Sequence, residues 1–309
     1  MRLFRMTVVA AVALALVAGA CGSSKKSSSS SSSSSGAKAT ITIGSANFSE
    51  STIMAEAYAG ALEAKGYKVN RKYNLGAREV YYPAATGGSI DLFPDYAATL
   101  LEYVDKGTGL ATASAKETVD KLNAQLSSAG LTALEASPAL DANAFAVTKA
   151  TADKYHLTKL SDLAAVAGQL KLGAPAECAQ RPYCALGLKN VYGINFKELL
   201  PFKFDSPEVK TALKNGNVDV AELGTTDGTV DADGFVILQD DKNLQLADNL
   251  TPVIRTKVLT DDIKATLNKV SASMTTSELA ALDKRADVDK EDPETVAHSW
   301  LTSKGIVKK

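Results

Sequence analysis

The feature that most limits the fold of this chain is an alternation of strand and helix patterns that begins at residue 39. The stretch 39–45 (ATITIGS) is typical of a buried strand, and the next segment carries apolar side chains at helical spacing from Ile53 to Leu62, before Gly66. The alternation continues with strand and helix patterns at 68–75, about 78–86, 90–93 and about 115–129. Such alternation predicts an α/β fold with a mainly parallel sheet.

A second series of the same kind occupies about residues 150–248. Its strand and helix patterns lie at 170–175, 186–192, 199–204, 206–215, 218–224 and 235–240. Three further helix patterns begin near Thr260, Thr275 and Asp292, and Thr275 with Glu278 fits a capping box. Pattern alone therefore predicts two α/β units, and it does not assign each segment to one of them.

Composition excludes several classes of protein. With 45% hydrophobic and 22% charged residues in 309, the chain is not collagen-like, fully disordered or a multi-span membrane protein. Its 34 Lys and Arg side chains nearly balance 35 Asp and Glu side chains, so the formal charge is −1. A near-neutral chain lacks the basic surface that nucleic acids require, and we expect no nucleic-acid partner.

Residues 1–20 have the pattern of a signal peptide. Arg2 and Arg5 precede an uncharged apolar stretch, 7–20, which is too short to span a bilayer comfortably. Small residues then lead directly to Cys21, and this junction resembles the bacterial lipobox, although Ala18 stands where Leu is usual. We expect cleavage before Cys21 and a lipid anchor on that residue. The alternative is a secretory signal without lipid and an incidental cysteine.

A polar segment, 21–38, follows and includes nine consecutive serines, Ser27–Ser35. Ser, Gly, Lys and Ala cannot bury enough apolar surface to offset the entropy of ordering, so we expect a flexible tether. Residues 1–38 hold two Arg and three Lys but no acid, which leaves a formal charge of −6 on the body that follows. A body of that charge would not bind anionic lipid strongly, so the expected membrane attachment is the covalent anchor.

The other two cysteines are Cys178 and Cys184. An even pair in an exported protein is usually oxidised, so we expect a disulfide that stiffens the loop around Arg181. A metal site is the weaker alternative, because the chain has two histidines, His156 and His298, and neither has ligand spacing to the cysteine pair. We therefore expect neither a metal nor a cofactor.

Catalytic motifs are missing from the sequence. It contains no P-loop, no G-x-S-x-G and no H-E-x-x-H, and GTGLAT (107–112) lacks the last Gly of a dinucleotide fingerprint. The acidic run at 287–292 lacks the Gly of an EF-hand loop and is typical of a solvated loop. We expect a protein that is not an enzyme.

Six stretches together resemble one family, the glycine betaine/choline/proline-type substrate-binding proteins of ABC importers. The resemblance covers about residues 40–305. The stretches are IGSANFSESTIMAEAYAGALEAKGYKV (43–69), NLGAREVYYPAATGGSIDLFPDYAAT (74–99), DANAFAVTKATADKYHLTKLSDLA (141–164), PAECAQRPYCALGLKNVYG (175–193), VDVAELGTTDGTV (218–230) and LTPVIRT (250–256). Six stretches in the family's order are far more specific than any one of them.

The resemblance implies a two-lobed type II periplasmic-binding fold with a ligand cleft between the lobes. Residues 39–145 and 250–309 would form lobe one, and residues 146–249 would form lobe two. Members of the family close their lobes around the ligand and present the closed form to a permease. They typically hold a quaternary ammonium group on aromatic ring faces, and a carboxylate with Arg and with hydroxyl or backbone donors.

Residues that match the family's motifs form the candidate ligand site. Tyr96 and Thr99 fall on the Tyr and the final Thr of the Y-T-G-T motif, and Phe145 falls where the family usually has Tyr. Arg181 falls on the Arg that is expected to meet a carboxylate. The full candidate set is Asn47, Phe48, Glu50, Arg78, Tyr96, Thr99, Phe145, Arg181, Thr225, Thr226 and Asp227.

Some of these residues also have a purely structural interpretation. Phe145 follows a strand-like pattern and is equally typical of a core residue. Arg181 could instead cap the disulfide loop or pair with Glu177. Glu50 could be only a first-turn acid at a helix N-terminus, and Arg78 could be a solvated helix residue.

The chain departs from the family near Gly224 and Ala247, where two further aromatic residues are common. Each lost cation–π contact is worth about 2 kcal/mol at a desolvated site, so binding would weaken by roughly several tens-fold to a thousandfold unless other rings compensate. The rings that could compensate are Tyr81, Tyr82, Tyr103 and Tyr183. A different solute, larger or aromatic, is therefore an alternative ligand.

The sequence thus predicts a monomeric, lipid-anchored substrate-binding protein on the extracytoplasmic side of the cell membrane. Its ligand would be a zwitterionic or cationic osmolyte, glycine betaine-like, and its partners an ABC permease with its ATPase subunits. The alternatives from other classes are an exported hydrolase, which the scarcity of histidine disfavours, and a scaffold, which a structure without an interlobe cleft would favour.

Overall fold

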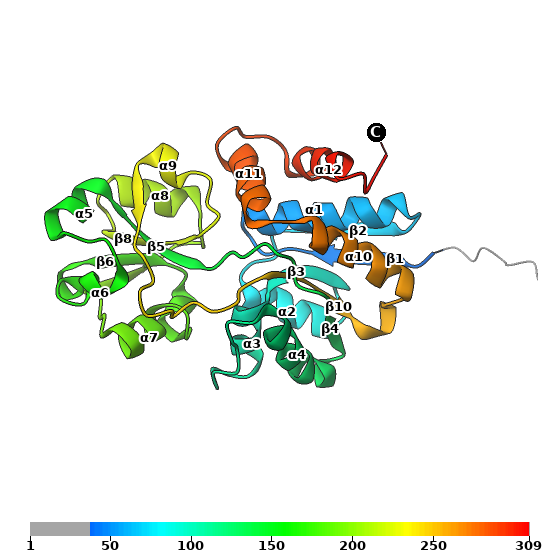
Figure 1. Cartoon of the computed structure of the whole chain (residues 1–309), viewed down its shortest axis with the longest axis horizontal. Coiled ribbons are helices and arrows are strands. Elements are labelled where there is room, and N and C mark those ends of the chain that lie inside the picture. The colour runs from blue at the N-terminus through cyan, green and yellow to red at the C-terminus, as the bar shows by residue number, and fades with distance from the viewer. Residues whose placement is uncertain (1–37, 309) are drawn as a thin grey trace, which may run out of the picture. The chain divides into compact units, whose positions relative to one another are not determined.

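Two five-stranded β-sheets, each flanked by helices, form the framework of this chain (Figure 1). The computed structural model describes residues 38–308. The predicted signal peptide, Cys21 and the predicted tether up to residue 37 lie outside the described residues. Within 38–308, no helix combines the length and the apolar character needed to cross a membrane.

We call the first sheet and its helices lobe one. The strand order of this sheet is β2-β1-β3-β10-β4. β1 pairs in parallel with β2 and β3, whereas β10 is antiparallel to both β3 and β4. The strands are β1 (Thr40–Gly44), β2 (Lys68–Lys72), β3 (Leu92–Tyr96), β4 (Leu131–Ala133) and β10 (Leu250–Arg255).

We call the second sheet and its helices lobe two. The strand order is β7-β6-β8-β5-β9. β6 pairs in parallel with β7 and β8, whereas β5 is antiparallel to both β8 and β9. The strands are β5 (Asn143–Thr148), β6 (Lys171–Ala174), β7 (Glu198–Pro201), β8 (Val220–Gly224) and β9 (Phe235–Ile237).

One strand in each sheet therefore runs against the other four. These two strands, β5 and β10, are the ones with which the chain enters lobe two and returns to lobe one (Figure 1). The predicted α/β fold with mainly parallel sheets is confirmed for both lobes. The predicted lobe boundary between residues 145 and 146 lies within β5.

Helices cover both faces of the first sheet. α1 packs with α10, α11 and α12 on one face, while α2, α3 and α4 lie on the other (Figure 1). Met54 and Tyr58 of α1 share an apolar cluster with Trp300 and Leu301 of α12. The helices are α1 (Ser49–Ala64), α2 (Arg78–Thr86), α3 (Ala97–Val104), α4 (Ala115–Leu126), α10 (Asp261–Ser273), α11 (Thr276–Asp287) and α12 (Pro293–Ser303).

The helices of lobe two are shorter. Val209 and Leu213 of α8 pack on Val218 and on Leu223 of β8 in a cluster of their own. The helices are α5 (Lys149–Tyr155), α6 (Leu160–Leu163), α7 (Ala185–Gly187), α8 (Pro207–Lys214) and α9 (Val230–Asp233). A π-helical turn at Leu188–Tyr192 continues α7, and 3₁₀ turns lie at Ser127–Ala129, Ala167–Gln169, Ala176–Gln180 and Thr256–Val258.

Local sequence signals set several helix ends as predicted. Ser206, Thr260, Thr275 and Asp292 are N-cap residues, and each side chain accepts a hydrogen bond from a backbone amide of the first turn. Such bonds satisfy amide groups that would otherwise have no partner in the helix. Gly66 ends the turn after α1 with a φ of 84°, a conformation that suits glycine.

Several short elements are not predicted by the sequence patterns, and α3 and β4 show why. Tyr96 is both the last residue of β3 and the N-cap of α3, so no turn residue announces this helix. β4 has only three residues, too few to display a strand periodicity. The strand expected at 90–93 is observed at 92–96, which brings Tyr96 to its carboxyl end.

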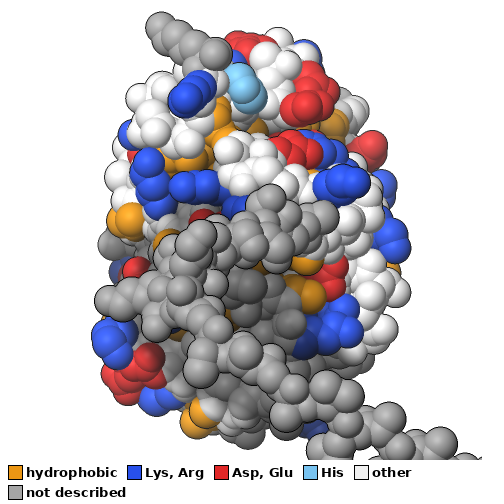
Figure 2. Space-filling view, turned by 90° about the vertical axis from the view of Figure 1, so that its right-hand side faces the viewer, with side chains coloured by type: hydrophobic (Ala, Val, Ile, Leu, Met, Phe, Trp, Pro, Cys, Tyr) orange, Lys and Arg blue, Asp and Glu red, His pale blue; other side chains and the backbone are white. Residues whose placement is uncertain are grey.

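The face of lobe one that carries the ends of α10 and α12 is shown in Figure 2. Over its visible part, basic and acidic side chains are interspersed, and hydrophobic side chains form small separate areas. Mixed charge of this kind accords with the near-neutral formal charge of the chain.

The start of α12 provides a test of the capping argument. Asp292 Oδ1 accepts hydrogen bonds from the backbone amides of Glu294 and Thr295, at 3.0 and 3.3 Å. Asp292→Ala should lower the free energy of unfolding by about 1 kcal/mol, as the loss of an N-cap does. Denaturant titration of the full chain measures the change. Asp289→Ala, which removes a nearby acid that caps no helix, serves as the control, and equal effects of both substitutions would contradict the capping role.

Candidate functional site

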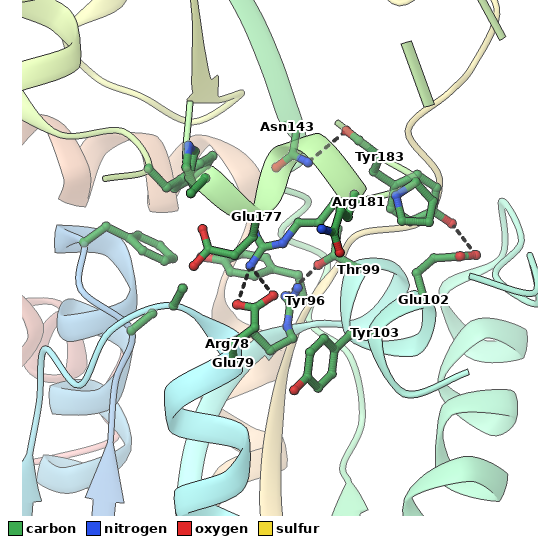
Figure 3. A pocket seen from close by; sticks show the side chains of 18 of the residues that line it. Arg78, Glu79, Tyr96, Thr99, Glu102, Tyr103, Asn143, Glu177, Arg181 and Tyr183 are labelled. Carbon is green, nitrogen blue, oxygen red and sulfur yellow. Dashed lines mark hydrogen bonds and ion pairs between the residues drawn. The ribbon is translucent and has the colours of Figure 1, made fainter. Parts of the chain in front are cut away.

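A cavity of about 970 Å³ lies between the two lobes. Its walls include residues at the carboxyl ends of β1 and β3 in lobe one and of β6 and β7 in lobe two. Ligands of open α/β sheets bind outside the carboxyl ends of the strands. The cavity, seen from close by in Figure 3, is therefore the candidate ligand site.

The structure separates the predicted ligand-binding residues into two groups. Those that line the cavity are Asn47, Phe48, Arg78, Tyr96, Thr99 and Arg181. Those that do not are Glu50, Phe145, Thr225, Thr226 and Asp227. Of the four tyrosines expected to compensate for missing rings, Tyr81, Tyr103 and Tyr183 line the cavity, whereas Tyr82 packs edge-on against Tyr103, with ring centroids 5.3 Å apart.

Aromatic rings from both lobes converge on the cavity. Phe48 is stacked with Tyr96 of lobe one at 6.3 Å between ring centroids, and it meets Phe204 of lobe two edge-to-face at 5.3 Å. The face of an aromatic ring is electron-rich and attracts cations. The seven aromatic residues that line the cavity are Phe48, Tyr81, Tyr96, Tyr103, Tyr183, Phe202 and Phe204.

Arg78, the first residue of α2, is fixed by Asp95 at the end of β3. Its Nη2 donates to Asp95 Oδ1 at 2.6 Å and to Thr99 Oγ1 at 2.8 Å, and its Nε also contacts the Asp95 carboxylate. Burial opposes the charge of the guanidinium, but the Asp95 carboxylate outweighs burial and raises the pKa of Arg78. Arg78 therefore stays charged at the cavity wall, with two of its three nitrogens already bonded.

The disulfide between Cys178 and Cys184 closes the loop that carries Arg181, which confirms the predicted pairing. The loop also depends on Gly187, because a Cβ at that position would lie 1.7 Å from the carbonyl oxygen of Pro182. No side chain larger than hydrogen fits there. The disulfide and the glycine together hold the loop in one shape.

Arg181 reaches across the cavity from lobe two to lobe one. Its Nη2 donates to both carboxylate oxygens of Glu79 in α2, at 3.0 and 2.8 Å (Figure 3). The partner is therefore Glu79, and not the Glu177 that the sequence offered as an alternative. A second interlobe hydrogen bond runs from the Tyr183 hydroxyl to Glu102 Oε1, at 3.2 Å.

Three buried carboxyl groups also line the cavity, those of Glu102, Asp141 and Asp248. Burial raises the pKa of all three, and that of Asp248 reaches about 7 although the Thr99 backbone amide and Arg78 lower it. Burial favours the protonated form of these carboxyl groups, whereas a cation bound in the cavity would stabilise their ionised form. These three groups would therefore favour a cation close to them.

Glu50 lies behind the cavity wall and joins the two lobes. Its carboxylate accepts hydrogen bonds from the hydroxyls of Tyr96 and of Thr226 in lobe two, the latter at 2.5 Å. Two further buried acids, Asp141 and Asp283, adjoin it, and their pKa values are raised by burial and by the negative charge of Glu50. Glu50 and Thr226 thus form an interlobe contact beside the cavity.

Phe145 belongs to the core of lobe two and is 1% exposed. Asn143, at the start of the same strand, lines the cavity. β5 runs away from the cavity, and two residues along a strand correspond to about 7 Å. Phe145 is therefore a core residue, which is the structural interpretation of this position given above.

The loop after β8 is held by bonds within the protein. Thr225 Oγ1 donates to Asp141 Oδ1 at 3.0 Å, and Asp227 forms an ion pair with Lys210 at 3.1 Å. Asp227 also accepts a hydrogen bond from the Thr229 amide. Both Thr225 and Asp227 therefore fix the loop, and their side chains do not face the cavity.

Sequence reasoning missed several residues that line the cavity. Phe202 and Phe204 alternate at the end of a strand, and this pattern is a signal that could have found them. No comparable local signal marks the acids, because their position depends on how the chain crosses between lobes. The missed residues discussed above are Glu79, Glu102, Asp141, Asn143, Asp248, Phe202 and Phe204.

A family model described as the substrate binding domain of an ABC-type glycine betaine transport system matches residues 39–303. The chain belongs to this family. It is therefore a substrate-binding protein of ABC transport and not an enzyme, and the family is extracytoplasmic. The resemblance seen in the six sequence stretches is confirmed.

Similar proteins match this chain over most of its length. The carnitine transport binding protein of Listeria monocytogenes is 28% identical over 281 residues, which are 85% of this chain and 86% of that protein. The glycine betaine-binding protein YehZ of Escherichia coli (strain K12) is 28% identical over 285 residues, 88% of this chain and 93% of that protein. A crystal structure of a glycine betaine/carnitine/choline ABC transporter matches with a TM-score of 0.66 and 26% identity, over 86% of this chain and 99% of that one.

Glu222 of β8 lies beneath the disulfide and is 2% exposed. One of its carboxylate oxygens and the Sγ atoms of Cys178 and Cys184 lie within 4.8 Å of one another. Oε2 has no hydrogen-bond partner among the described residues. Burial raises the pKa of Glu222 to about 7, although the charge of Arg181 lowers it.

The raised pKa predicts how stability depends on pH. A carboxyl group whose pKa is higher in the folded state stabilises the protein at low pH, and this contribution is lost as the pH rises from about 4.5 through about 7. The unaltered chain should therefore lose stability between pH 5 and pH 8 that the Glu222→Gln variant keeps. The difference in unfolding free energy between the two should shift by about 2 to 3 kcal/mol in favour of the variant. Denaturant titration at both pH values measures the gain.

Glu135→Gln, at an exposed position, is the matched control and should show no such gain. The disulfide must remain oxidised throughout. A difference between Glu222→Gln and the unaltered chain that is the same at pH 5 and pH 8 would contradict the raised pKa.

Proposed function

We propose that this protein captures a small zwitterion of the glycine betaine type in the interlobe cavity and delivers it to an ABC permease with its ATPase subunits. The observation that carries the proposal is the chemistry of the cavity wall. Aromatic rings from both lobes and buried carboxyl groups line the same cavity as the guanidinium of Arg181. A quaternary ammonium group suits the rings, and a carboxylate suits the guanidinium.

In this proposal five of the predicted residues have distinct roles. Tyr96 and Phe48 receive the ammonium group, and Arg181 receives the carboxylate. Glu50 and Thr226 act from behind the wall by joining the lobes. The first and last parts of the body, 39–145 and 250–309, would close as lobe one against 146–249.

The proposal includes the attachment to the membrane. Cleavage before Cys21 and lipidation of that cysteine would anchor a monomer on the extracytoplasmic side of the cell membrane, with 21–38 as tether. The support is the sequence pattern described above, because these residues lie outside the described part of the chain.

Isothermal titration calorimetry with glycine betaine, carnitine, choline, proline betaine and ergothioneine tests the ligand class. We expect binding heat with at least one zwitterion that carries a quaternary ammonium group, and a rise in melting temperature with the same compound. No heat and no thermal shift with any of the five would contradict the proposal.

A second candidate is a larger or aromatic solute. The supporting observation is a cavity of about 970 Å³ with seven aromatic residues in its wall. Native mass spectrometry of the ligand that co-purifies with the protein separates the two candidates by mass.

Arg181→Ala should weaken glycine betaine about 30-fold, because a hydrogen bond to a charged group contributes about 2 kcal/mol. Choline has the same trimethylammonium group but no carboxylate, so its affinity should change little. Calorimetry at one pH compares the two ligands. Lys203→Ala, which removes another cavity cation, is the control, and equal losses of both ligands with Arg181→Ala would contradict the assigned role.

A further inference from the structure

We propose that Glu79 competes with the carboxylate of the ligand for Arg181 and thereby sets the preference between zwitterionic and purely cationic ligands. The inference deepens the proposed function and rests on it. Glu79 lies in α2 of lobe one, lines the cavity, and faces Arg181 on the disulfide-closed loop of lobe two (Figure 3).

The contact between these two residues is distinctive within the described chain. Among residues 38–308, Arg181–Glu79 is the only ion pair that joins the two lobes. Its shortest distance, from Nη2 to Oε2, is 2.8 Å. The Glu79 carboxylate is thus bound to the Arg181 guanidinium, to which the carboxylate of the ligand would bind.

The geometry of the pair leaves room for replacement. Both Glu79 oxygens contact the same nitrogen, Nη2, so the pair does not use the two-nitrogen fork with which Arg binds carboxylates best. Within the described chain, Nε and Nη1 of Arg181 have no hydrogen-bond partner. A ligand carboxylate can therefore form parallel hydrogen bonds with two nitrogens of Arg181, whereas Glu79 contacts only one of them.

Exposure also distinguishes this pair from the other guanidinium of the cavity. Arg78 and Asp95 have side chains that are 9% and 0% exposed, and they remain bound to each other. The side chains of Arg181 and Glu79 are 26% and 36% exposed. Ion pairs of that exposure contribute little net stability, so Arg181 can be released to a ligand at small cost.

The charge of Glu79 acts in opposite directions on the two classes of ligand. A zwitterion must displace Glu79 from Arg181 and bring its own carboxylate close to another one, which weakens its binding. A cation without a carboxylate leaves the pair intact and gains from one more negative charge in the wall. Glu79 therefore shifts selectivity toward cations.

The test is Glu79→Gln in the full chain, with calorimetric titration of glycine betaine and choline. Both ligands carry a trimethylammonium group, so only their other ends differ. We expect glycine betaine to bind about three- to fivefold more tightly than to the unaltered chain, the range of an exposed ion pair. Choline should bind with equal or lower affinity, so the ratio of the two affinities changes in favour of betaine.

Two further variants isolate the contact. Glu177→Gln removes the same charge from the cavity wall but has no bond to Arg181, and it should change the affinity ratio less than Glu79→Gln does. In an Arg181→Ala background, Glu79→Gln should no longer favour betaine, because the competition has been removed. Circular dichroism and melting curves confirm that each variant is folded.

Each other outcome overturns the inference in a different way. Weaker betaine binding with Glu79→Gln would mean that Glu79 orients Arg181 for the ligand. Equal weakening of betaine and choline binding would mean that the Arg181–Glu79 pair only holds the lobes together. If Glu177→Gln changed the affinity ratio as much as Glu79→Gln does, the total charge of the cavity wall would determine the ligand preference. If the unaltered chain binds none of the five ligands of the calorimetric panel, the proposed function fails and this inference with it, whereas an unchanged ratio of the betaine and choline affinities overturns this inference alone.

Discussion

The site depends on one topological constraint: the strand by which the chain enters each lobe from the cavity runs against the other four strands of that lobe's sheet. β5 and β10 are these strands, and both begin beside the cavity. As a consequence, β1 and β3 of lobe one and β6 and β7 of lobe two end at the cavity, and residues that follow these strands supply part of its wall. The residues that we propose meet the ligand are therefore held by two sheets, and the two crossings are where the proposed closure of the lobes would occur.

Charge in the cavity is organised by burial. The Arg78–Asp95 pair is buried, and two of the three Arg78 nitrogens are bonded, so it forms part of the fixed wall. The buried acids Asp141 and Asp248 have raised pKa values and are best satisfied by a cation. The contact between Arg181 and Glu79 is only partly buried, and we propose that it changes partners. A fixed ion pair and, in our proposal, an exchangeable one thus line the same cavity, where both ends of a zwitterion would find a partner.

The sequence predicted the elements with strong local signals and the residues that lie at strand ends. Helices that begin at a capping residue, such as Asp292, were found at their starts, and Tyr96, which was predicted as a ligand residue, lies at the carboxyl end of β3. Phe145 shows the limit of motif matching, because a position in a motif does not tell how deep in the lobe a side chain lies. Glu79 could not be predicted as the partner of Arg181, since the two come together only when both lobes have folded.

The most direct test of the account is a crystal structure of the protein with glycine betaine. The account predicts that the trimethylammonium group lies against the rings of Tyr96 and Phe48, and that the carboxylate makes two hydrogen bonds to Arg181 in place of Glu79. A ligand bound outside the interlobe cavity, or bound within it with the carboxylate away from Arg181, would contradict the account.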